Sequence, residues 1–541
     1  MENVNELPIE VLTRIFDYFD VRERRHVSAV CTLWRDILHS VRFQRQCRTF
    51  LDGRFEEEFT ESEKTVLQSC RNLSIILWDE ENESVYDYEI EDDAEGREKE
   101  EIIPLTYLFN PTPQQNITDL IFSQKLDLER LDLNSTFVSC REILQDRLEK
   151  LENLKELSLL FDFRPVSSSQ EVDPQVWSIR HNRIETLRIG LLDDIQPITL
   201  TAPNLTILDL KPKCPWILDI IRSYKHQLQS LKIDFQNVES MSTLMMMEFP
   251  CLTHLNVQML EDKDNQIRYA RTRNRFVDEE IEERFVKGMP KLKQLLLTSN
   301  LMFFRIAKAL AKYAYQLEEI SLEEQQMDYE LLKVVERIPK LRRLTMLRCE
   351  VMDLGQVHPT LSLPPCLSEL ELLHSKSNLV FNKGLAGLKS LNVCAWTSKN
   401  HKILHKICKN LPNLEHLTVA FNSPKLENTA LRHLHRLTKL KTLTMTSMEL
   451  KLLHWKHCSV VPSVQRLTFE NCTLHQSMFR PIVELFPSLK ELYLDRCEFK
   501  YCDNDNDSDN DDSEDRDNKS VEQLRELFPL CRVSFRKWLP I

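Results

Sequence analysis

Apolar residues recur along most of the chain in the pattern L-x-x-L-x-L, in which x is usually polar. The first apolar residue of the pattern falls at sixteen positions from Leu128 to Leu530, and thirteen of the fifteen intervals are 21–30 residues long. Side chains alternate along a strand, so the last two apolar residues of each unit lie on one face of a short strand. The regular interval predicts a stack of similar units, each burying its apolar face against its neighbours.

A helix is expected between successive strands. Residues 304–315 (FRIAKALAKYAY) show the period of an amphipathic helix. Proline ends a helix because it lacks an amide donor and favours extended backbone in the residue before it. Eight prolines stand two residues before the first apolar residue of a unit, at Pro203, Pro250, Pro290, Pro339, Pro365, Pro412, Pro462 and Pro487.

These units resemble leucine-rich repeats. The resemblance implies an α/β solenoid, a horseshoe with its strands on the concave side, and weaker matches at Leu73 and Ile117 indicate irregular leading repeats. It also implies that the residue at one position after the strand, which is Asn or Cys in this family, forms hydrogen bonds with backbone amides at the turn. That position is occupied by Asn300, Cys349, Asn422, Cys472 and Cys497. The alternative, a leucine-rich helical bundle, would not keep this spacing.

Residues 6–38 follow a helical period instead. Two apolar faces recur at helical spacing, one formed by Ile9, Leu12, Ile15, Phe16 and Phe19 and the other by Val27, Val30, Cys31, Trp34 and Leu38. Two helices in about forty residues are too few to bury both faces by themselves. The segment therefore predicts a small helical domain that needs a partner.

The same segment resembles an F-box. Its motifs are Leu7-Pro8-Ile9-Glu10, Ile15-Phe16, Phe19-Asp20 and Val30-Cys31-Thr32-Leu33-Trp34. The family usually has two apolar residues where this chain has Arg24 and Arg25. The resemblance implies docking onto the Skp-type adaptor of a Skp–cullin–F-box ligase through Leu7, Pro8, Ile15, Phe16, Val30, Cys31 and Trp34. The alternative is a helical hairpin that only caps the solenoid.

Composition narrows the possible functions. The chain has only 7 glycines and no GxGxxG or GxxxxGK[ST] motif, which argues against nucleotide-dependent catalysis. Its 15 cysteines include no CxxC pair, which argues against zinc ribbons and thioredoxin-like sites. No apolar run has the length of a signal-peptide core or a membrane span. We therefore expect a chain of the cytoplasm, the nucleus or both, with reduced thiols, no cofactor and no membrane partner.

The net charge of −13 hides an uneven distribution. Residues 79–101 hold 13 acids and 2 bases, residues 503–517 hold 9 acids and 1 base, and the rest of the chain carries +6. Both runs are expected to be solvated loops. A pI near 5.7 argues against nucleic acid as a partner. The expected layout is an F-box-like helical domain at 3–48, a linker with irregular leading repeats at 49–115, and a solenoid at 116–541 with insertions near 262–283 and 503–517.

Three weaker patterns suggest other chemistry. His401, His405 and Cys408 have the helical spacing of three metal ligands, which would suit a metal-dependent enzyme, although no HExxH motif is present. Residues 503–514 place acids at several positions of a calcium loop, but serine stands where the loop needs glycine, and an acidic insertion is simpler. The cluster Arg268, Arg271, Arg273 and Arg275 pairs with neighbouring acids or contacts an acidic or phosphorylated target.

Both resemblances together imply an F-box/leucine-rich-repeat protein. Such a protein is a non-catalytic substrate receptor of a Skp–cullin–F-box ubiquitin ligase, which reaches cullin through the adaptor and presents a protein target for ubiquitination and proteasomal degradation. The alternative is a repeat scaffold that binds proteins without ligase activity. Residues between the last two apolar positions of each unit point away from the core. Target contacts are therefore expected at Arg188, Asp209, Lys232, Asn256, Glu371, Asn392 and Tyr493. The rival view places recognition on the convex helices or on the arginine cluster.

Overall fold

A computed structural model describes most of the repeats and part of the N-terminal segment. The described residues are 9–17, 31, 33–34, 37, 48–52, 70–76, 127–135, 140, 144, 147–161, 177–190, 197–211, 216–235, 238–259, 279–298, 300–324, 326–327, 329–351, 363–373, 385–395, 403–421, 431–450, 458–500 and 513–536. Ile117, Asn422, the arginine cluster and residues 79–101 lie outside them. The chain divides into two units, Met1–Phe249 and Pro250–Ile541. None of the described helices has the length and apolar content needed to cross a membrane.

The first unit contains a ladder of parallel strands, each paired with the next repeat's strand. Its members are β1 (Arg48–Asp52), β2 (Asn72–Ile76), β3 (Arg130–Ser135), β4 (Glu156–Phe161), β6 (Thr186–Gly190), β8 (Ile207–Lys211) and β9 (Ser230–Phe235). Other elements of this unit are α1 (Ile9–Asp17), η3 (Leu148–Lys150), the parallel pair β5 (Trp177–Arg180) and β7 (Ile198–Thr201), α8 (Ile217–Tyr224) and α9 (Val238–Met245). Strands β1 and β2 fall in the region where irregular leading repeats are expected.

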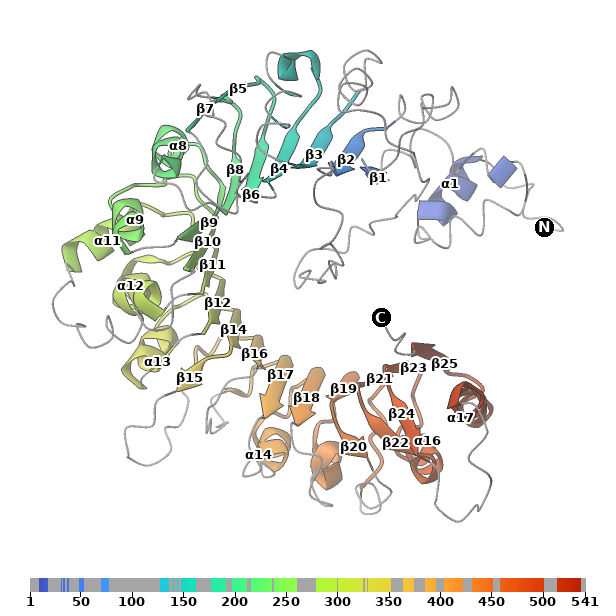
Figure 1. Ribbon diagram of the computed structural model, residues 1–541. Helices are drawn as coiled ribbons and strands as arrows, with labels where there is room; N and C mark the ends of the chain where they lie inside the picture. The colour runs from blue at the N-terminus through green and yellow to red at the C-terminus, as the bar shows by residue number, and fades with distance from the viewer. Residues whose placement is uncertain are drawn as a thin grey trace. The chain divides into compact units, whose positions relative to one another are not determined.

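The second unit repeats the same design, with helical segments on one side of its strands (Figure 1). Its ladder is β10 (His254–Met259), β11 (Gln294–Leu297), β12 (Glu319–Glu323), β14 (Arg343–Leu347), β16 (Glu369–Leu373), β17 (Ser390–Ala395), β18 (His416–Phe421), β19 (Thr442–Thr446), β21 (Arg466–Glu470), β23 (Glu491–Asp495) and β25 (Arg532–Arg536). The helical segments are α11 (Glu279–Lys287), α12 (Asn300–Tyr313), α13 (Tyr329–Glu336), α14 (Ile403–Asn410), η6 (Leu431–Arg436), η7 (Gln476–Met478), α16 (Phe479–Leu485) and α17 (Ser513–Leu527). Short parallel ladders join β13 (Gln326–Met327) to β15 (Glu350–Val351), and β20 (Glu449–Leu450) through β22 (Thr473–His475) to β24 (Glu498–Lys500).

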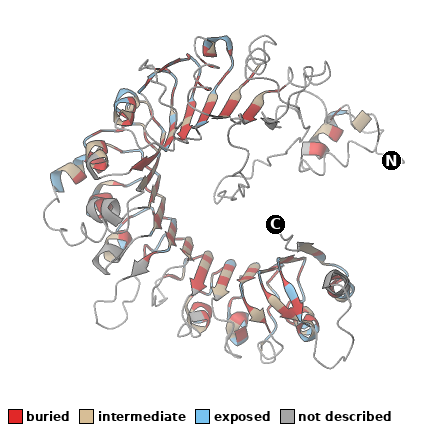
Figure 2. Cartoon of the chain, viewed as in Figure 1, coloured by how far each residue is buried: buried red, intermediate tan, exposed pale blue. Residues whose placement is uncertain are grey.

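The apolar positions of the repeat form the core of each unit. In β19, for example, Leu443 and Met445 are fully buried while the residues between and beside them are partly exposed. Figure 2 shows this alternation along the ladder strands. The weaker match at Leu73 is three residues out of place. Leu73 is fully buried in β2 but pairs with Leu131, the second apolar position of the next unit, so the first position of this repeat is the buried Cys70. The predicted leucine-rich-repeat solenoid is thus confirmed by one-strand repeats stacked in parallel register.

One predicted repeat position is wrong. Leu530, expected as the first apolar residue of the last unit, is 95% exposed. The amide of Cys531 donates to the carbonyl of Phe528, as the amide of Leu489 donates to that of Phe486 one repeat earlier. Cys531 therefore takes the turn position in this repeat, and Leu530 is turned outward.

A tight turn follows several strands of the second unit. Glu324, Arg348, Ser447, Asn471 and Arg496 each come directly after a ladder strand and have φ between 50° and 57°, in the left-handed region. The amide of Arg348, for instance, donates across to the carbonyl of Leu373 in the next repeat at 2.8 Å. This turn redirects the chain from the strand toward the helical side of the repeat.

The three described cysteines of the predicted turn position are buried and bonded to backbone. Cys349, Cys472 and Cys497 donate their thiols to the carbonyls of Leu322, Met445 and Phe469 in the preceding repeat, at 3.3, 3.2 and 3.2 Å. The resemblance implies bonds to backbone amides, but these thiols donate to backbone carbonyl groups, since a thiol carries a hydrogen to donate. Asn300 differs from them, because it begins α12.

Candidate interaction surfaces

Helix α1 buries one face in the small N-terminal domain. Leu12 and Phe16 are 1% exposed and cluster with Ile37, and Leu33 and Trp34 pack against them. The Phe16 ring meets the Trp34 ring edge-on, with centroids 5.3 Å apart. Leu12, Phe16 and Trp34 belong to the two apolar faces expected from the helical period, whereas Leu33 and Ile37 belong to neither.

A second group of apolar side chains on α1 stays in solvent. Ile9 and Val11 are 56% and 40% exposed. Exposed apolar residues beside a packed helical core are typical of a surface that a partner covers. The helical period predicted Ile9 on the buried apolar face, which is wrong, and Val11 belongs to neither predicted face. The signal was available, because Val11 falls outside the apolar set that defines the buried face.

The predicted adaptor-binding residues have different positions in the domain. Leu7, Pro8 and Val30 lie outside the described residues, and Ile15 lies in α1. Phe16 lies in the domain's own core, where it packs α1 against Trp34 and is shielded from a partner. Cys31 and Trp34 are half-buried. These residues remain predictions as adaptor contacts.

In each unit, the residues between the last two apolar positions form a row across the strands. The register of the first unit aligns Ser74, Asp132, Ser158, Arg188, Asp209 and Lys232. The register of the second unit aligns Asn256, Leu296, Ser321, Thr345, Glu371, Asn392, Thr418, Thr444, Thr468, Tyr493 and Ser534. We call these the first-unit row and the second-unit row. All seven predicted target contacts lie in the rows and are half-buried.

The first-unit row includes three residues that the predicted list omitted, namely Ser74, Asp132 and Ser158. Asp132 and Ser158 are buried at 5% and 7% exposure. The pattern starting at Leu128 and Leu154 places them at the same repeat position as Arg188, so the signal was in the sequence. The row of polar groups therefore begins earlier in the chain than expected.

Charged side chains of the first unit pair with one another across neighbouring strands. Arg130 Nε lies 3.1 Å from Asp132 Oδ2 and 3.8 Å from Glu156 Oε2. Arg188 Nη1 lies 3.9 Å from the same Glu156 oxygen. Opposite charges thus alternate along β3, β4 and β6, which fixes these long side chains in place before any target arrives.

Two carboxylates at the end of this unit are incompletely satisfied. Asp209 Oδ1 and Asp234 Oδ1 are buried and have no hydrogen-bond partner, although Lys232 Nζ lies 3.8 Å from Asp209 Oδ2. Asp234 is 7% exposed. Burial raises the pKa of Asp234 to about 6, and the opposing effect of Lys232 and Lys211 is smaller. A charged Asp234 therefore costs stability at neutral pH.

The middle of the second-unit row is neutral. Thr418, Thr444 and Thr468 follow one another in register on β18, β19 and β21. No hydrogen bond joins their hydroxyls to another described residue. The row offers donors and acceptors that a target can use without first breaking an ion pair.

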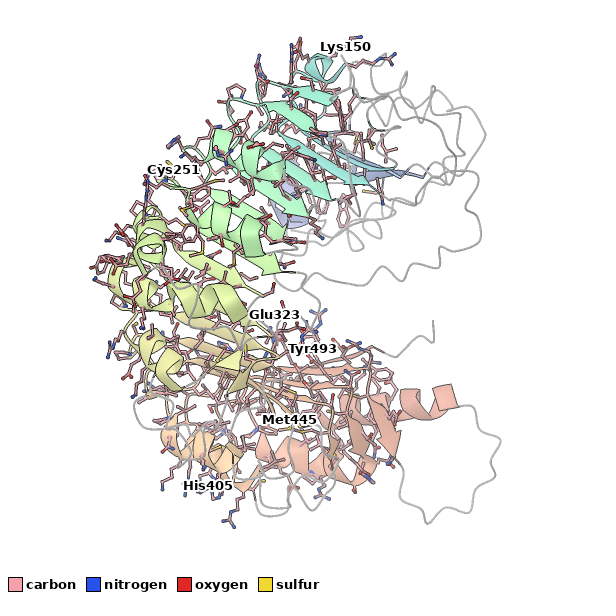
Figure 3. The ribbon with its side chains drawn as sticks, turned by 60° about the vertical axis from the view of Figure 1, so that its left-hand side comes forward. Lys150, Cys251, Glu323, His405, Met445 and Tyr493 are labelled. Atoms are coloured by element: carbon pink, nitrogen blue, oxygen red, sulfur yellow. The ribbon has the colours of Figure 1, made fainter. Side chains whose placement is uncertain are left out.

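The row reaches Tyr493, which Figure 3 labels together with Met445 and Glu323. The guanidinium of Arg466 lies 5.7 Å from the centre of the Tyr493 ring, and Arg466 Nε lies 2.5 Å from Glu491 Oε2. The hydrogen bond from Arg466 lowers the pKa of Glu491. An aromatic ring beside an ion pair is a common component of protein-binding surfaces.

The described residues do not form a metal site. His405 and Cys408 both lie on α14, but Cys408 is 1% exposed, and burial raises the pKa of its thiol to about 12. His401 and Asp503 lie outside the described residues. Within the part of the chain that the structure describes, no three histidine, cysteine, aspartate or glutamate side chains are grouped to hold a metal ion.

Comparison with known proteins identifies the N-terminal domain. Residues 4–49 match the F-box-like family. Among solved structures, the chain is similar to an internalin from Listeria monocytogenes, with 13% identity, 62% of this chain and 82% of that chain covered, and a TM-score of 0.30. It is also similar to a chain of the mouse RP105/MD-1 complex, with 16% identity, coverages of 69% and 63%, and a TM-score of 0.34. A search of curated proteins finds no match.

At these TM-scores, the solved structures carry no argument about this chain, and the repeat assignment rests on the strand register. The chain joins an F-box-like domain to leucine-rich repeats. It therefore has the two-part organisation of F-box/leucine-rich-repeat proteins.

Proposed function

We propose that this chain is the target-binding subunit of a Skp–cullin–F-box ubiquitin ligase. The observation that carries the proposal is the F-box-like match at residues 4–49, together with exposed Ile9 and Val11 above a packed helical core. The domain would bind a Skp-type adaptor and, through it, cullin. The repeats would hold a protein for ubiquitination and proteasomal degradation, in the cytoplasm, the nucleus or both.

In this proposal, no side chain of the chain performs chemistry. Its contribution is to raise the effective concentration of the target near the ubiquitin-conjugating enzyme and to orient it. The second-unit row supports this role, because its hydroxyl and amide groups are ordered on strands and face away from the core. The alternative is a repeat scaffold that binds proteins without ligase activity, for which the two rows alone would suffice.

Adaptor binding is tested by co-purification of the full chain with a purified Skp-type adaptor and cullin. Trp34→Ala removes a half-buried aromatic side chain, and loss of an aromatic anchor at an interface typically costs about 2 kcal/mol, or roughly thirtyfold in affinity. Leu7→Ala/Pro8→Ala is expected to have the same direction of effect. Because Trp34 also packs on Phe16, a loss with Trp34→Ala alone could reflect a damaged domain.

Ile9→Glu separates docking from folding, since Ile9 is exposed. A matched control is Val460→Glu, which puts the same charge on a 51% exposed apolar residue of the second unit. We expect Ile9→Glu to abolish co-purification and Val460→Glu to leave it unchanged. Undiminished adaptor binding by Trp34→Ala, Leu7→Ala/Pro8→Ala and Ile9→Glu would refute the proposal and favour the scaffold.

Target binding is tested separately. One variant replaces Arg188, Lys232 and Glu371 with alanine, and another replaces Arg268, Arg271, Arg273 and Arg275. We expect the first variant to lose target turnover while keeping adaptor binding. Turnover that survives the first set and fails with the second would place recognition on the arginine cluster.

A further inference from the structure

One stretch of the second unit's sequence is rich in positive charge that has no part in the proposed function. Residues 399–460 contain eleven lysines and arginines and three acids, together with seven histidines, in a chain whose net charge is −13. Local charge opposite in sign to that of the whole chain indicates a surface for an oppositely charged partner.

Helix α14 and the 3-10 helix η6 bring this charge together. These segments of successive repeats pack against each other, and the rings of His405 and His433 meet with centroids 4.3 Å apart. Figure 3 shows His405 on the helical side of the unit. The lysines and arginines around this contact are half-buried or exposed. We call them the basic helical face: Lys406, Lys409, Arg432, Arg436 and Lys439.

Almost no negative charge offsets this face. Among the described residues 403–421 and 431–441, the single carboxylate is Glu415, whose Oε2 lies 2.6 Å from Lys441 Nζ. Lys439 Nζ lies 2.8 Å from Asn413 Oδ1, which is a neutral partner. The other four residues of the face have no ion pair within the described part of the chain.

The two histidines experience the resulting positive potential. His433 Nε2 accepts a hydrogen bond from Arg432 Nε at 2.9 Å, so this ring nitrogen is unprotonated. Burial lowers the pKa of His433, and His405, Arg432, Arg436 and His435 lower it further. His405 Nδ1 is buried without a hydrogen-bond partner. Neither α14 nor η6 contains an aspartate or a glutamate, so neither element presents a carboxylate to the ring pair.

We propose that the basic helical face binds an anionic segment of a partner protein, formed by glutamate, aspartate or phosphorylated side chains. Clustered guanidinium groups suit this role, because each donates several hydrogen bonds to carboxylate or phosphate oxygens. Helix α14 has eight residues and is about 12 Å long, which fits a short peptide. The proposal is independent of the F-box-like domain and of the strand rows.

Nucleic acid fits the same face less well. Neither α14 nor η6 contains phenylalanine, tyrosine or tryptophan, on which unpaired bases stack. A long polyanion would also extend beyond the face and meet a chain with net charge −13. A short acidic peptide interacts only with the local charge, because salt screens charges more than about 8 Å away.

Binding is measured with the full chain by fluorescence anisotropy, using a fluorescein-labelled decapeptide of alternating glutamate and serine. The matched probe replaces every glutamate with glutamine. The variant Arg432→Gln/Arg436→Gln is expected to weaken binding by roughly tenfold, since each exposed charge pair contributes up to about 1 kcal/mol. Its control is Arg480→Gln/Arg525→Gln, which removes two exposed arginines that already pair with Glu484 and Glu522.

We expect the control variant to bind like the unmodified chain and the glutamine peptide not to bind. Binding also tightens as the pH falls from about 7.5 to 6, because the bound anion favours protonated His433. Equal binding of both peptides, or equal losses in both variants, would overturn the proposal. Tighter binding of labelled decathymidine than of the acidic peptide would overturn it in favour of nucleic acid, and affinity that does not rise on acidification would contradict the histidine linkage.

Discussion

The two strand rows differ in how much of their polar surface is already occupied. In the first unit, the charged side chains around the row form ion pairs across neighbouring strands, and Asp132 is almost fully buried. In the second unit, the threonines of the row leave their hydroxyls unbonded within the described residues. A target that meets the first row must displace existing pairs, whereas one that meets the second can bond directly. The two units share one backbone design. The first-unit row is suited to stability and specificity through its ion pairs, and the second-unit row is suited to hydrogen bonding with a target.

The largest expected effect comes from breaking a buried ion pair of the first unit. Arg130→Met keeps the apolar stem but removes the cation that lies 3.1 Å from the buried Asp132, which we expect to cost roughly 3–5 kcal/mol. The matched variant Arg466→Met breaks an exposed pair of the second unit and is expected to cost less than about 1 kcal/mol. Hydrogen exchange of β2–β4 and of β19–β23 measures both losses. Equal losses would show that the Arg130–Asp132 pair is no better shielded from water than the Arg466–Glu491 pair.

A smaller effect of opposite sign is expected for Asp234→Asn. The folded-state pKa of Asp234, about 6, lies above its ordinary value of 3.8, so the unmodified chain gains stability as the pH falls through the folded value and loses it as the pH rises. Removing the charge is therefore expected to stabilise the first unit by up to about 3 kcal/mol near neutral pH. This advantage is expected to disappear toward about pH 4.

The measurement for this variant is thermal unfolding as a function of pH. Asp219→Asn serves as the control, because Asp219 is exposed on α8 with its side chain paired to Arg222. The control is expected to show no such pH-dependent gain. If Asp234→Asn is instead less stable than the unmodified chain at neutral pH, a hydrogen-bond donor compensates the buried carboxylate of Asp234.

Thiol labelling tests the packing beneath the second-unit row. Burial raises the pKa of Cys472 to about 11 and that of Cys497 to about 12, so both thiols are protonated and shielded at mildly alkaline pH. Cys366 is exposed. We expect iodoacetamide to modify Cys366 in the folded chain and to spare the other two, as read by mass spectrometry. Similar labelling rates for all three would mean that these turns open readily.

The smallest effect on stability is expected from the threonines. Replacing Thr418, Thr444 and Thr468 with alanine is expected to change the free energy of unfolding by less than about 0.5 kcal/mol each. The same triple variant is expected to lose bound target, whereas Thr438→Ala, at an exposed position off the strands, keeps it. Urea unfolding and target retention are measured on the same samples. A large loss of stability with retained target would mean that the hydroxyls serve folding rather than recognition.

Much of this arrangement follows from the sequence because the repeat is a local pattern. The alternation at Leu443 and Met445 and the helix around residues 304–315 each depend on a few neighbouring residues, and both predictions are confirmed. The exposure of Leu530 could not be anticipated, because it depends on which residue closes a turn against Phe528. The unsatisfied carboxylate of Asp234 could not be predicted from the sequence either, because side chains of two strands make up its environment. Within α1, the helical period identified Leu12 and Phe16 as buried but also placed the exposed Ile9 on the same face, because a period does not show where the packed neighbours end.

The most direct test of the central claim is proximity labelling by the full chain in cells, with and without proteasome inhibition, in parallel with the Ile9→Glu variant. If the chain delivers targets to a ubiquitin ligase, a set of labelled proteins accumulates when the proteasome is inhibited. With Ile9→Glu, the same proteins are expected to accumulate without inhibition, because they still bind the repeats but are no longer degraded. A labelled set whose abundance is unaffected by both the inhibitor and the variant would contradict the account and indicate a scaffold that binds its partners without driving their degradation.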